Sequence, residues 1–385
     1  MSEFSDLALI EPLLRAVGAS QFPAPTAIQN EAIPAILKGR DVWACAQTGS
    51  GKTAAFALPL LQNLLNGERG TPVCLRALVL VPTRELAAQV GESIQFFAGY
   101  LERPCKVIAV FGGVSINPQM MALRGGADVV VATPGRLLDL VDHNALQLAQ
   151  VTTLVLDEAD RLLDLGFADE LAGIIRRLPQ RRQNLLFSAT FPPAVRLLAE
   201  KLLHEPVRID VPASAATQPD IVQRSINVDP ARRTQLLRHL INRHAWAATL
   251  VFVATRYATG HVAEKLRRAG IPAAALSGDL SQGARTKALA DFKAGRVKVL
   301  VATDVAARGI DIVQLPAVVN YDLPRSTTDY VHRIGRTGRA GESGVAVSFV
   351  PAGVEQHFRL IEKRQGLRVA REIVPGFEPA ASASH

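Results

Sequence analysis

The sequence has few aromatic and few sulfur-containing side chains. Aromatic residues make up 5% of the 385 residues, so aliphatic side chains have to fill the cores. The three cysteines, Cys45, Cys74 and Cys105, are far apart in the chain, and no two have the spacing of a metal-ligand or redox pair. Disulfides are therefore not expected, and the chain fits a reducing compartment such as the cytoplasm.

The sequence also lacks a membrane span, a secretory leader and an excess of acidic residues. No apolar stretch reaches the roughly 18 residues that a spanning helix needs, and residues 1–6 are not a basic stretch ahead of an apolar one. We therefore expect neither a membrane anchor nor a signal peptide. The net charge is +8, which favours a polyanionic partner such as nucleic acid. On charge alone, an ordinary basic protein without such a partner is an equally good alternative.

What the sequence does contain is a regular alternation of short aliphatic runs with longer helix-like stretches. The length suits two domains, and a composition of 48% hydrophobic and 20% charged residues is typical of a globular chain. The runs are typical of strands buried on both faces, as in a parallel sheet flanked by helices. One predicted helix covers 83–97, with Thr83 as its N-cap. The predicted strands lie at 41–46, 77–81, 106–110, 128–132, 153–156, 184–187, 250–253, 273–276, 297–302, 318–321 and 345–350.

The alternation pauses once, at residues 211–220. This stretch is small, polar and bracketed by prolines, so we interpret it as an exposed linker. The fold prediction is an α/β chain with an N-terminal domain at 1–210 and a C-terminal domain at 221–385, each a mostly parallel sheet flanked by helices. Many of the aliphatic runs end in small or polar residues, and ligands bind beyond the carboxyl ends of parallel strands. We therefore expect these residues to gather at one edge of each sheet.

A phosphate-binding loop follows the first predicted strand. Residues 46–53, Ala-Gln-Thr-Gly-Ser-Gly-Lys-Thr, match the phosphate-loop pattern except that Ala46 replaces its first glycine. The glycines let backbone N–H groups surround phosphate oxygens, Lys52 supplies a charge for the β- and γ-phosphates, and the Thr53 hydroxyl can bind Mg²⁺. A glycine-rich turn before a helix is the alternative, and the preceding strand argues against it. The predicted nucleotide-binding residues here are Gln47, Thr48, Gly49, Ser50, Gly51, Lys52 and Thr53.

Two acidic residues end another predicted strand of the same domain. Asp157 directly follows the predicted strand 153–156. A carboxylate at this position can hold Mg²⁺ opposite Thr53, so we predict Asp157 to be a metal ligand. Glu158 is then placed to orient or deprotonate a water that attacks the nucleotide. An acidic helix N-cap is the alternative for these residues. We favour the catalytic interpretation because a phosphate loop lies in the same domain.

The ordered set of motifs resembles the DEAD-box RNA helicases of superfamily 2, and the resemblance covers nearly the whole chain. The short Asp-Glu-Ala-Asp at 157–160 could occur by chance, whereas the ordered set could not. The resemblance implies two tandem RecA-like domains, ATP and Mg²⁺ as cofactors, and RNA as the partner. The other motifs are Pro-Thr-Arg-Glu-Leu-Ala at 82–87, Gly-Gly at 112–113, Thr-Pro-Gly-Arg at 133–136, Ser-Ala-Thr at 188–190, Gln-Gly-Ala-Arg at 282–285, Ala302 to Asp311, and His332 to Arg339.

The resemblance also assigns roles ahead of the phosphate loop. Pro-Thr-Ala-Ile-Gln at 25–29 is similar to the family's adenine-recognition motif, in which an amide such as that of Gln29 donates to and accepts from the adenine edge. Phe22 would lie against the base, and Phe4 stands where the family has an isolated upstream aromatic residue. Gln21 replaces the usual glycine before Phe22, so the local loop shape is expected to differ. Without the resemblance, Gln29 would be interpreted as an exposed helix residue.

In the C-terminal domain, the resemblance implies two arginine fingers. Arg336 and Arg339 would reach ATP from the other domain, and planar guanidinium groups suit phosphate oxygens. A solvated basic turn is the alternative for these arginines. Asp311 would contact the ribose of the nucleotide. The residues implied to couple hydrolysis to strand separation are Ser188, Thr190, Asp160 and His332.

The implied RNA contacts go to the sugar-phosphate backbone. Such contacts carry no sequence information, so we expect little sequence preference. The residues implied to make them are Arg84, Gly113, Thr133 and Arg136 in the first domain and Gln282, Arg285 and Thr303 in the second.

Three functions remain open on these motifs. The first is an RNA-stimulated ATPase that unwinds short duplexes, and the second is an ATP-gated RNA clamp with little unwinding. The third is a translocating DNA helicase, against which the adenine motif and the acidic tetrad argue. Residues 373–379 are similar to the bacterial RhlE-like branch of the family. The RNA target, and any ribosomal or RNA-decay protein partner, are not identified by the sequence.

Overall fold

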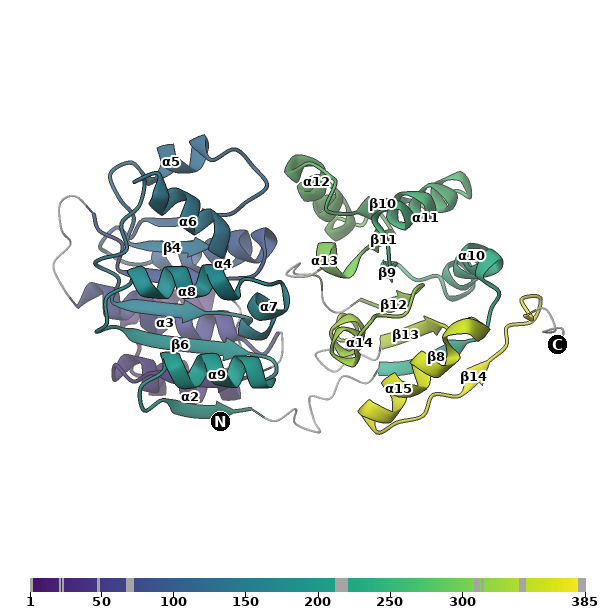
Figure 1. Cartoon of the computed structure of the whole chain (residues 1–385), viewed down its shortest axis with the longest axis horizontal. Coiled ribbons are helices and arrows are strands. Elements are labelled where there is room, and N and C mark those ends of the chain that lie inside the picture. The colour runs from purple at the N-terminus through teal and green to yellow at the C-terminus, as the bar shows by residue number, and fades with distance from the viewer. Residues whose placement is uncertain are drawn as a thin grey trace. The chain divides into compact units, whose positions relative to one another are not determined.

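The chain divides into two compact units, Met1–Ser214 and Ala215–His385, each built on one sheet (Figure 1). The computed structural model describes residues 3–20, 22, 24–46, 49–66, 73–211, 221–307, 312, 315–338 and 344–379. Residues 212–220 of the predicted linker therefore lie outside the described residues. None of the helices in the described part of the chain combines the length and the apolar character that a bilayer crossing requires.

The first unit holds a seven-stranded sheet in the order β3-β4-β2-β5-β6-β1-β7, and every strand pairing in it is parallel. Its strands are β1 (Val42–Cys45), β2 (Ala77–Leu80), β3 (Val107–Val110), β4 (Val129–Ala132), β5 (Thr153–Leu156), β6 (Gln183–Ser188) and β7 (Val207–Asp210). Its helices are η1 (Phe4–Leu7), α1 (Glu11–Ala19), α2 (Ala27–Leu37), α3 (Lys52–Leu65), α4 (Arg84–Ala98), α5 (Asn117–Leu123), α6 (Pro134–Asp142), α7 (Ala159–Asp164), α8 (Ala168–Arg177) and α9 (Pro193–Leu202).

The second unit repeats this plan with a parallel sheet in the order β10-β11-β9-β12-β13-β8-β14. Its strands are β8 (Ile221–Ile226), β9 (Thr249–Phe252), β10 (Ala273–Leu276), β11 (Val299–Ala302), β12 (Ala317–Asn320), β13 (Gly344–Phe349) and β14 (Arg371–Glu372). Its helices are η2 (Pro230–Arg232), α10 (Arg233–His244), α11 (Arg256–Arg268), α12 (Gln282–Lys293), α13 (Asp304–Ala307), α14 (Thr327–Ile334), η3 (Ala352–Val354) and α15 (Glu355–Gln365). The prediction of two tandem α/β units with parallel sheets is confirmed.

Both faces of each sheet are covered by aliphatic clusters, which explains the continuous apolar runs. Alternate residues of β2 enter different clusters, with Ala77 and Val79 on the face covered by α1–α4, and Leu78 and Leu80 on the face covered by α5–α9. In the second unit α10 and α11 cover one face, while α12–α15 cover the other. Each fully buried leucine or valine contributes roughly 1.5–3 kcal/mol to the unfolding free energy, so both cores are held mainly by these layers.

The predicted burial on both faces is correct for the central strands and wrong for the edges. All residues of β2, β4, β5, β9, β11 and β12 are buried, whereas β3 and β10 are partly exposed because each has only one neighbouring strand. The sequence prediction also missed β7, β8 and β14. These strands are short or half-exposed, so they lack the apolar runs that identified the others.

Polar side chains begin several helices as expected. The hydroxyl of Thr83 accepts a hydrogen bond of 3.2 Å from the backbone N–H of Leu86, which confirms the predicted N-cap of α4. Thr255, Ser281 and Ser326 cap α11, α12 and α14 in the same way. These caps fix where the helices start relative to the carboxyl ends of the preceding strands.

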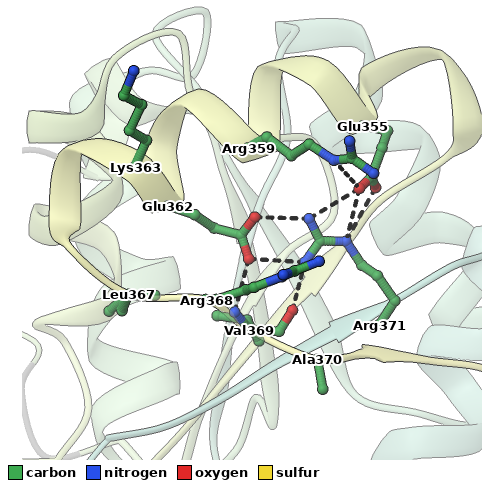
Figure 2. A pocket seen from close by; sticks show the side chains of 9 residues that line it. All are labelled: Glu355, Arg359, Glu362, Lys363, Leu367, Arg368, Val369, Ala370 and Arg371. Atoms are coloured by element: carbon green, nitrogen blue, oxygen red, sulfur yellow. Dashed lines mark hydrogen bonds and ion pairs between the residues drawn. The ribbon is translucent and has the colours of Figure 1, made fainter.

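An arginine on the edge strand β14 ties that strand to α15 (Figure 2). The Arg371 guanidinium donates to Glu362 at 2.8 and 2.9 Å and to Glu355 at 3.0 and 3.1 Å. It also lies 4.7 Å from the ring centroid of Phe358. The cluster lines an open hollow of about 600 Å³ that contains none of the predicted site residues. Its role is therefore interpreted as structural.

Replacing Arg371 with methionine is expected to lower the unfolding free energy of the second unit by about 3 kcal/mol, because Glu362 is buried and would lose its partner. Hydrogen bonds from Arg371 hold the pKa of both glutamates below their ordinary value. This stabilisation is complete above the ordinary glutamate pKa of about 4.3, and it is lost as the pH falls through the lowered folded pKa.

Thermal melts between pH 7 and pH 3 measure both effects. The wild type should lose stability below about pH 4.3 more steeply than Arg371→Met, in which the glutamate pKa values return to their ordinary range. The matched control is Arg364→Met, since Arg364 is an exposed arginine at the end of α15. Equal melting of the two variants at pH 7 would contradict the structural role of Arg371.

Candidate nucleotide and nucleic-acid site

The strand order of the first sheet collects the motif residues at one edge. Because all strands are parallel, the loops after β5, β6 and β1 lie next to one another, and they carry the acidic tetrad, the Ser-Ala-Thr motif and the phosphate loop. The loops after β3, β4 and β2 form a second group, which carries Gly112–Gly113, Thr133 and Thr83–Arg84. The predicted nucleotide residues and the predicted RNA residues of this unit therefore occupy neighbouring halves of the same edge.

The phosphate loop has the backbone conformation that its glycines permit. Gly49 and Gly51 have φ angles of +81° and +89°, which are strained for any residue with a Cβ atom. Gly51 is the N-cap of α3, so Lys52 and Thr53 occupy the first turn of that helix. The buried Lys52 ammonium donates a 2.9 Å hydrogen bond to the carbonyl of Ala46. The loop thus presents a helix N-terminus and a positively charged side chain at the carboxyl end of β1.

Gln29 is fully buried, so the alternative interpretation of Gln29 as an exposed helix residue is wrong. Its amide nitrogen donates to the carbonyl of Gly51 at 3.1 Å, and its amide oxygen accepts from the backbone N–H of Thr26 at 2.9 Å. A Cβ atom on Gly51 would lie 2.5 Å from this amide nitrogen, so the position requires glycine. The Phe22 ring is 37% exposed and lies 6.4 Å from the buried ring of Phe4, centroid to centroid. The segment predicted to recognise adenine is thus joined directly to the phosphate loop.

Asp157 is buried at the end of β5 beside a lysine. Burial raises the pKa of Asp157 to about 6, the positive charge of Lys52 opposes this rise, and the carboxylate of Glu158 adds to it. One carboxylate oxygen accepts a 2.9 Å hydrogen bond from the backbone N–H of Glu158. Such a buried carboxylate gains from a nearby cation, because a cation favours its charged form.

Glu158 has a backbone conformation that is unusual for a residue with a side chain. Its φ and ψ angles are both 51°, in the left-handed region, which costs roughly 1–2 kcal/mol. The carboxylate is buried, and its Oε2 atom lies 3.5 Å from Nε of Arg161, but this oxygen accepts no hydrogen bond from the described residues. The strained backbone therefore accompanies a buried carboxylate oxygen that accepts no hydrogen bond from the described residues.

The donor atoms present fit the Mg²⁺ ion that the family resemblance implies. The Thr53 hydroxyl and the Asp157 carboxylate are oxygen donors, and Mg²⁺ prefers oxygen ligands and retains several waters beside substrate phosphates. No group of three or more histidine, cysteine, aspartate or glutamate side chains that could form a protein cage occurs in the described part of the chain. This donor set therefore suits an ion that is held partly by a bound nucleotide.

Asp160 joins the acidic tetrad to the loop after β6. One of its carboxylate oxygens accepts from the Thr190 hydroxyl at 2.7 Å and from the Thr190 backbone N–H at 3.0 Å. The Ser188 hydroxyl accepts from the backbone N–H of Asp160 at 3.2 Å and donates to the carbonyl of Thr190 at 2.7 Å. Three of the four residues implied to couple hydrolysis to strand separation thus form one hydrogen-bonded group within the first unit.

The four predicted RNA residues of the first unit lie close to one another. Gly113 has a φ of +79°, and a Cβ atom added to it would lie 2.8 Å from Nη1 of Arg84. The Thr133 hydroxyl accepts a 3.4 Å hydrogen bond from the backbone N–H of Gly112. Arg136 donates to the carbonyl of Val114 at 2.8 Å, while its Nε and Nη1 atoms make no hydrogen bond to described residues. Two arginines and a backbone N–H group therefore meet at the ends of β2, β3 and β4, with Glu85 2.9 Å from Arg84 and Asp139 3.6 Å from Arg136.

The predicted RNA residues of the second unit follow the neighbouring strands β10 and β11. Thr303 comes directly after β11, and its hydroxyl accepts from the backbone N–H of Ala306 at 3.3 Å. Gln282 is the first residue of α12 and is half-buried. Arg285 is buried and donates to the carbonyls of Ser277 and Ala306 at 3.0 and 3.3 Å. Arg285 thus joins the loop after β10 to α13, the short helix that follows β11.

The arginine-rich segment is not a solvated basic turn, because Arg333 and Arg336 are both buried. Arg333 donates two hydrogen bonds of 2.6 Å to the carboxylate of Asp304 and one of 3.0 Å to the side chain of Asn320. This pair fixes α14, which carries the half-buried His332, against the loop that contains Thr303. Arg336 follows α14, and its carbonyl accepts from the backbone N–H of Leu315 at 3.1 Å.

The sequence interpretation missed two of these arginines. No role was assigned to Arg333 within the motif His332 to Arg339, although its guanidinium binds Asp304; the available signal was the acidic residue that follows Thr303 in the motif Ala302 to Asp311. Arg161, beside Glu158, was not identified, and its position three residues after a glutamate at a helix start was the available signal. Four predicted site residues lie outside the described residues: Gln47, Thr48, Asp311 and Arg339.

Comparison with known proteins agrees with this arrangement. Residues 26–198 match the DEAD/DEAH box helicase family, and residues 232–341 match the helicase conserved C-terminal domain. The chain is 46% identical to the ATP-dependent RNA helicase DeaD of Mycobacterium tuberculosis over 96% of its own length and 64% of that protein. It is 39% identical to the DEAD-box ATP-dependent RNA helicase CshA of Bacillus cereus, over 99% of its own length and 71% of that protein.

A solved structure gives the same result for the fold. S. cerevisiae Dbp5 bound to RNA and ADP BeF3 matches with a TM-score of 0.85 and 34% identity, over 97% of this chain and 96% of that one. The two parallel sheets and the phosphate loop define a protein with two tandem RecA-like units. The chain belongs to the DEAD/DEAH box helicase family. It spans less than two thirds of the length of the M. tuberculosis relative.

Proposed function

We propose that this protein is an ATP-dependent RNA helicase, which hydrolyses ATP and uses the cycle to remodel short RNA duplexes. One observation carries the proposal: Asp160 of the acidic tetrad is hydrogen-bonded to Ser188 and Thr190, and the Ser188 carbonyl accepts a 3.0 Å hydrogen bond from the backbone N–H of Ala46 in the phosphate loop, so the three motifs meet at the ends of β1, β5 and β6. The relatives that align with nearly the whole of this chain are named ATP-dependent RNA helicases.

In this proposal ATP is held by the first unit. The loop residues 47–53 bind the phosphates, Lys52 neutralises their charge, and Gln29 and Phe22 hold the adenine. Thr53 and Asp157 would hold Mg²⁺, which supplies charge neutralisation at the phosphates when it is bound. Asp311 would contact the ribose.

Glu158 is the proposed general base. It accepts a proton from the water whose oxygen forms the new bond to the γ-phosphorus, and the bond from that phosphorus to the bridging oxygen breaks. The Oε2 atom that accepts no hydrogen bond from described residues supports this role. ADP and inorganic phosphate are the products.

The roles proposed for the remaining residues require both domains. We place these domains at 1–210 and 221–385, with a linker at 211–220. Arg336 and Arg339 would stabilise the transition-state charge, and His332 would couple the second domain to the reaction. When ATP and RNA each favour a closed arrangement, each tightens the binding of the other by the same factor. A shift from mostly open to mostly closed needs roughly 5 kcal/mol of differential binding.

RNA is the proposed substrate, held through its sugar-phosphate backbone. The residues proposed for this contact are Arg84, Gly113, Thr133, Arg136, Gln282, Arg285 and Thr303. Dbp5, which is similar over nearly the whole chain, was solved with RNA bound. We also propose the cytoplasm as the site of action, because the wide spacing of the three cysteines in the sequence fits a reducing compartment. Membership of the RhlE-like branch and the binding of a protein partner stay predictions.

The test is the ATPase rate with and without a panel of RNAs and DNAs, combined with strand displacement in hydrolysable and non-hydrolysable ATP. A helicase should be stimulated by RNA and should displace strands only with hydrolysable ATP. An ATP-gated clamp, the alternative, would bind RNA tightly with either nucleotide and displace little. Equal stimulation by DNA would contradict the proposal.

Replacing Lys52 with alanine is expected to weaken ATP binding at least tenfold, because the phosphates lose a charge that a hydrogen bond to Ala46 holds in place. Isothermal titration with a non-hydrolysable ATP analogue measures the affinity. The control is Lys38→Ala, since Lys38 is an exposed lysine of the same unit. Normal ATP affinity in the Lys52 variant would show that the nucleotide binds elsewhere.

A further inference from the structure

An exposed aromatic pair marks the start of α11. The side chain of Tyr257 is 79% exposed, in a chain with only four tyrosines. Its ring stacks on that of His261 one helical turn further on, with centroids 5.6 Å apart and planes 18° apart. The high exposure leaves much of the tyrosine ring in solvent, where a second flat ring can stack on it.

Basic residues follow the two aromatic residues on the same face of α11. Tyr257, His261, Lys265 and Arg268 are all exposed and follow at spacings of four, four and three residues, which places them on one stripe of the helix. The opposite stripe, which includes Val262 and Leu266, packs into the core. Exposed aromatic and basic side chains on one surface are the combination that single-stranded nucleic acid binds.

The stripe has an excess of positive charge. Glu264 forms ion pairs with Arg267 and Arg268 at 2.6 and 2.9 Å, so one acid is shared between two arginines. The exposed Lys265 forms no ion pair with an acidic side chain in the described part of the chain. The surface beside the tyrosine therefore attracts a polyanion rather than an apolar or basic partner.

The stripe begins next to the proposed RNA-contacting residues of the same unit. Helix α11 follows β9, and β11, which Thr303 follows, lies beside β9 in the sheet (Figure 1). Arg256, the residue before Tyr257, forms a 2.6 Å ion pair with Asp279 in the loop that leads to Gln282. The first turn of α11 is thus tied to the segment whose helix would hold the RNA backbone.

We propose that Tyr257 is a stacking platform for one base of the single-stranded RNA that leaves the backbone-contacting residues, with Lys265 holding a phosphate further along. The inference rests on the proposed RNA function and extends it, because all the other proposed RNA contacts go to the backbone. A stacked base adds affinity with little dependence on sequence. It would also fix the direction in which the strand leaves the second unit.

The test is RNA binding by fluorescence anisotropy at one fixed salt concentration, using a single-stranded oligoadenylate with a non-hydrolysable ATP analogue. Tyr257→Ala should weaken binding at least about five-fold, the lower end of what one stacked base contributes. Tyr257→Phe keeps the aromatic ring and should stay within about two-fold of the wild type. Leu360→Ala, at an exposed apolar residue of α15, is the matched control and should not change the affinity.

A second arm moves a single abasic nucleotide along the oligonucleotide. At one position the abasic site should weaken wild-type binding about five-fold or more and leave Tyr257→Ala binding unchanged, because the two changes remove the same contact. The stacking platform is refuted if wild type and Tyr257→Ala bind equally, or if the two losses add at every position. If the wild-type chain binds no RNA, the proposed function is overturned as well. The stacking platform and the proposed function therefore fail with different results.

Discussion

Replacing Arg336 with alanine is expected to lower the rate of ATP turnover by roughly 10³–10⁵-fold, the range that an arginine finger contributes to phosphoryl transfer. ATP binding should change much less, since the phosphate loop and Gln29 belong to the first unit. Arg336 is buried in the turn after α14, so its guanidinium has a restricted position before any ligand binds. Single-turnover hydrolysis at saturating ATP and RNA measures the chemical step directly.

Two further variants separate this role from a loss of folding. Arg336→Lys keeps a positive charge and should still lose most of the turnover, because an ammonium lacks the planar, forked geometry of guanidinium. Arg325→Ala removes an exposed arginine ahead of α14 and should keep wild-type turnover. Unchanged kinetics in Arg336→Ala, with a normal melting temperature, would exclude the finger. If Arg336→Ala, but not Arg336→Lys, has a strongly lowered melting temperature, the turnover of Arg336→Lys tests the arginine finger.

Replacing Glu158 with glutamine is expected to lower turnover by about 10²–10⁴-fold, which is the contribution of a positioned general base. The substitution keeps the size of the side chain and removes only its ability to accept a proton. ATP should therefore still bind, and the complex with RNA should persist because hydrolysis no longer releases it. RNA retention in the presence of ATP, measured by anisotropy decay after competitor is added, should lengthen in parallel with the loss of turnover.

The matched control is Glu92→Gln, which changes an exposed glutamate of α4 in the same unit. Its turnover and RNA release should equal those of the wild type. If Glu158→Gln turned over ATP at the wild-type rate, the base would have to be another group. Rapid RNA release by a slow Glu158→Gln enzyme would instead contradict the link between hydrolysis and release.

Much of the fold could be predicted from the sequence because burial on both faces leaves a strong local signal. The central strands β2, β4, β5, β9, β11 and β12 are continuous apolar runs, and each was predicted within two residues. The signal disappears where one side of a strand faces solvent or the strand is very short. For that reason β7, β8 and β14 were missed, and the exposure of β3 and β10 was predicted wrongly.

The candidate site was predictable where the chemistry is local. The phosphate loop is one continuous segment, and its two left-handed glycines follow from the steric demands of the turn. The function of a side chain is harder to predict when its partner is distant in the chain. Gln29 resembles an exposed helix residue until Gly51 is placed against it, and Arg333 resembles a phosphate ligand until Asp304 occupies its guanidinium.

The sequence by itself determined that this protein has two parallel α/β units, a phosphate loop and polar residues after its strands, because each of these depends on neighbouring residues. Only the tertiary structure decided which strands are neighbours. Long helical crossovers allow a parallel strand to take many positions in a sheet, so periodicity does not fix the order. Packing places β6 between β1 and β5, and this order brings Lys52, Asp157 and Ser188 to one edge.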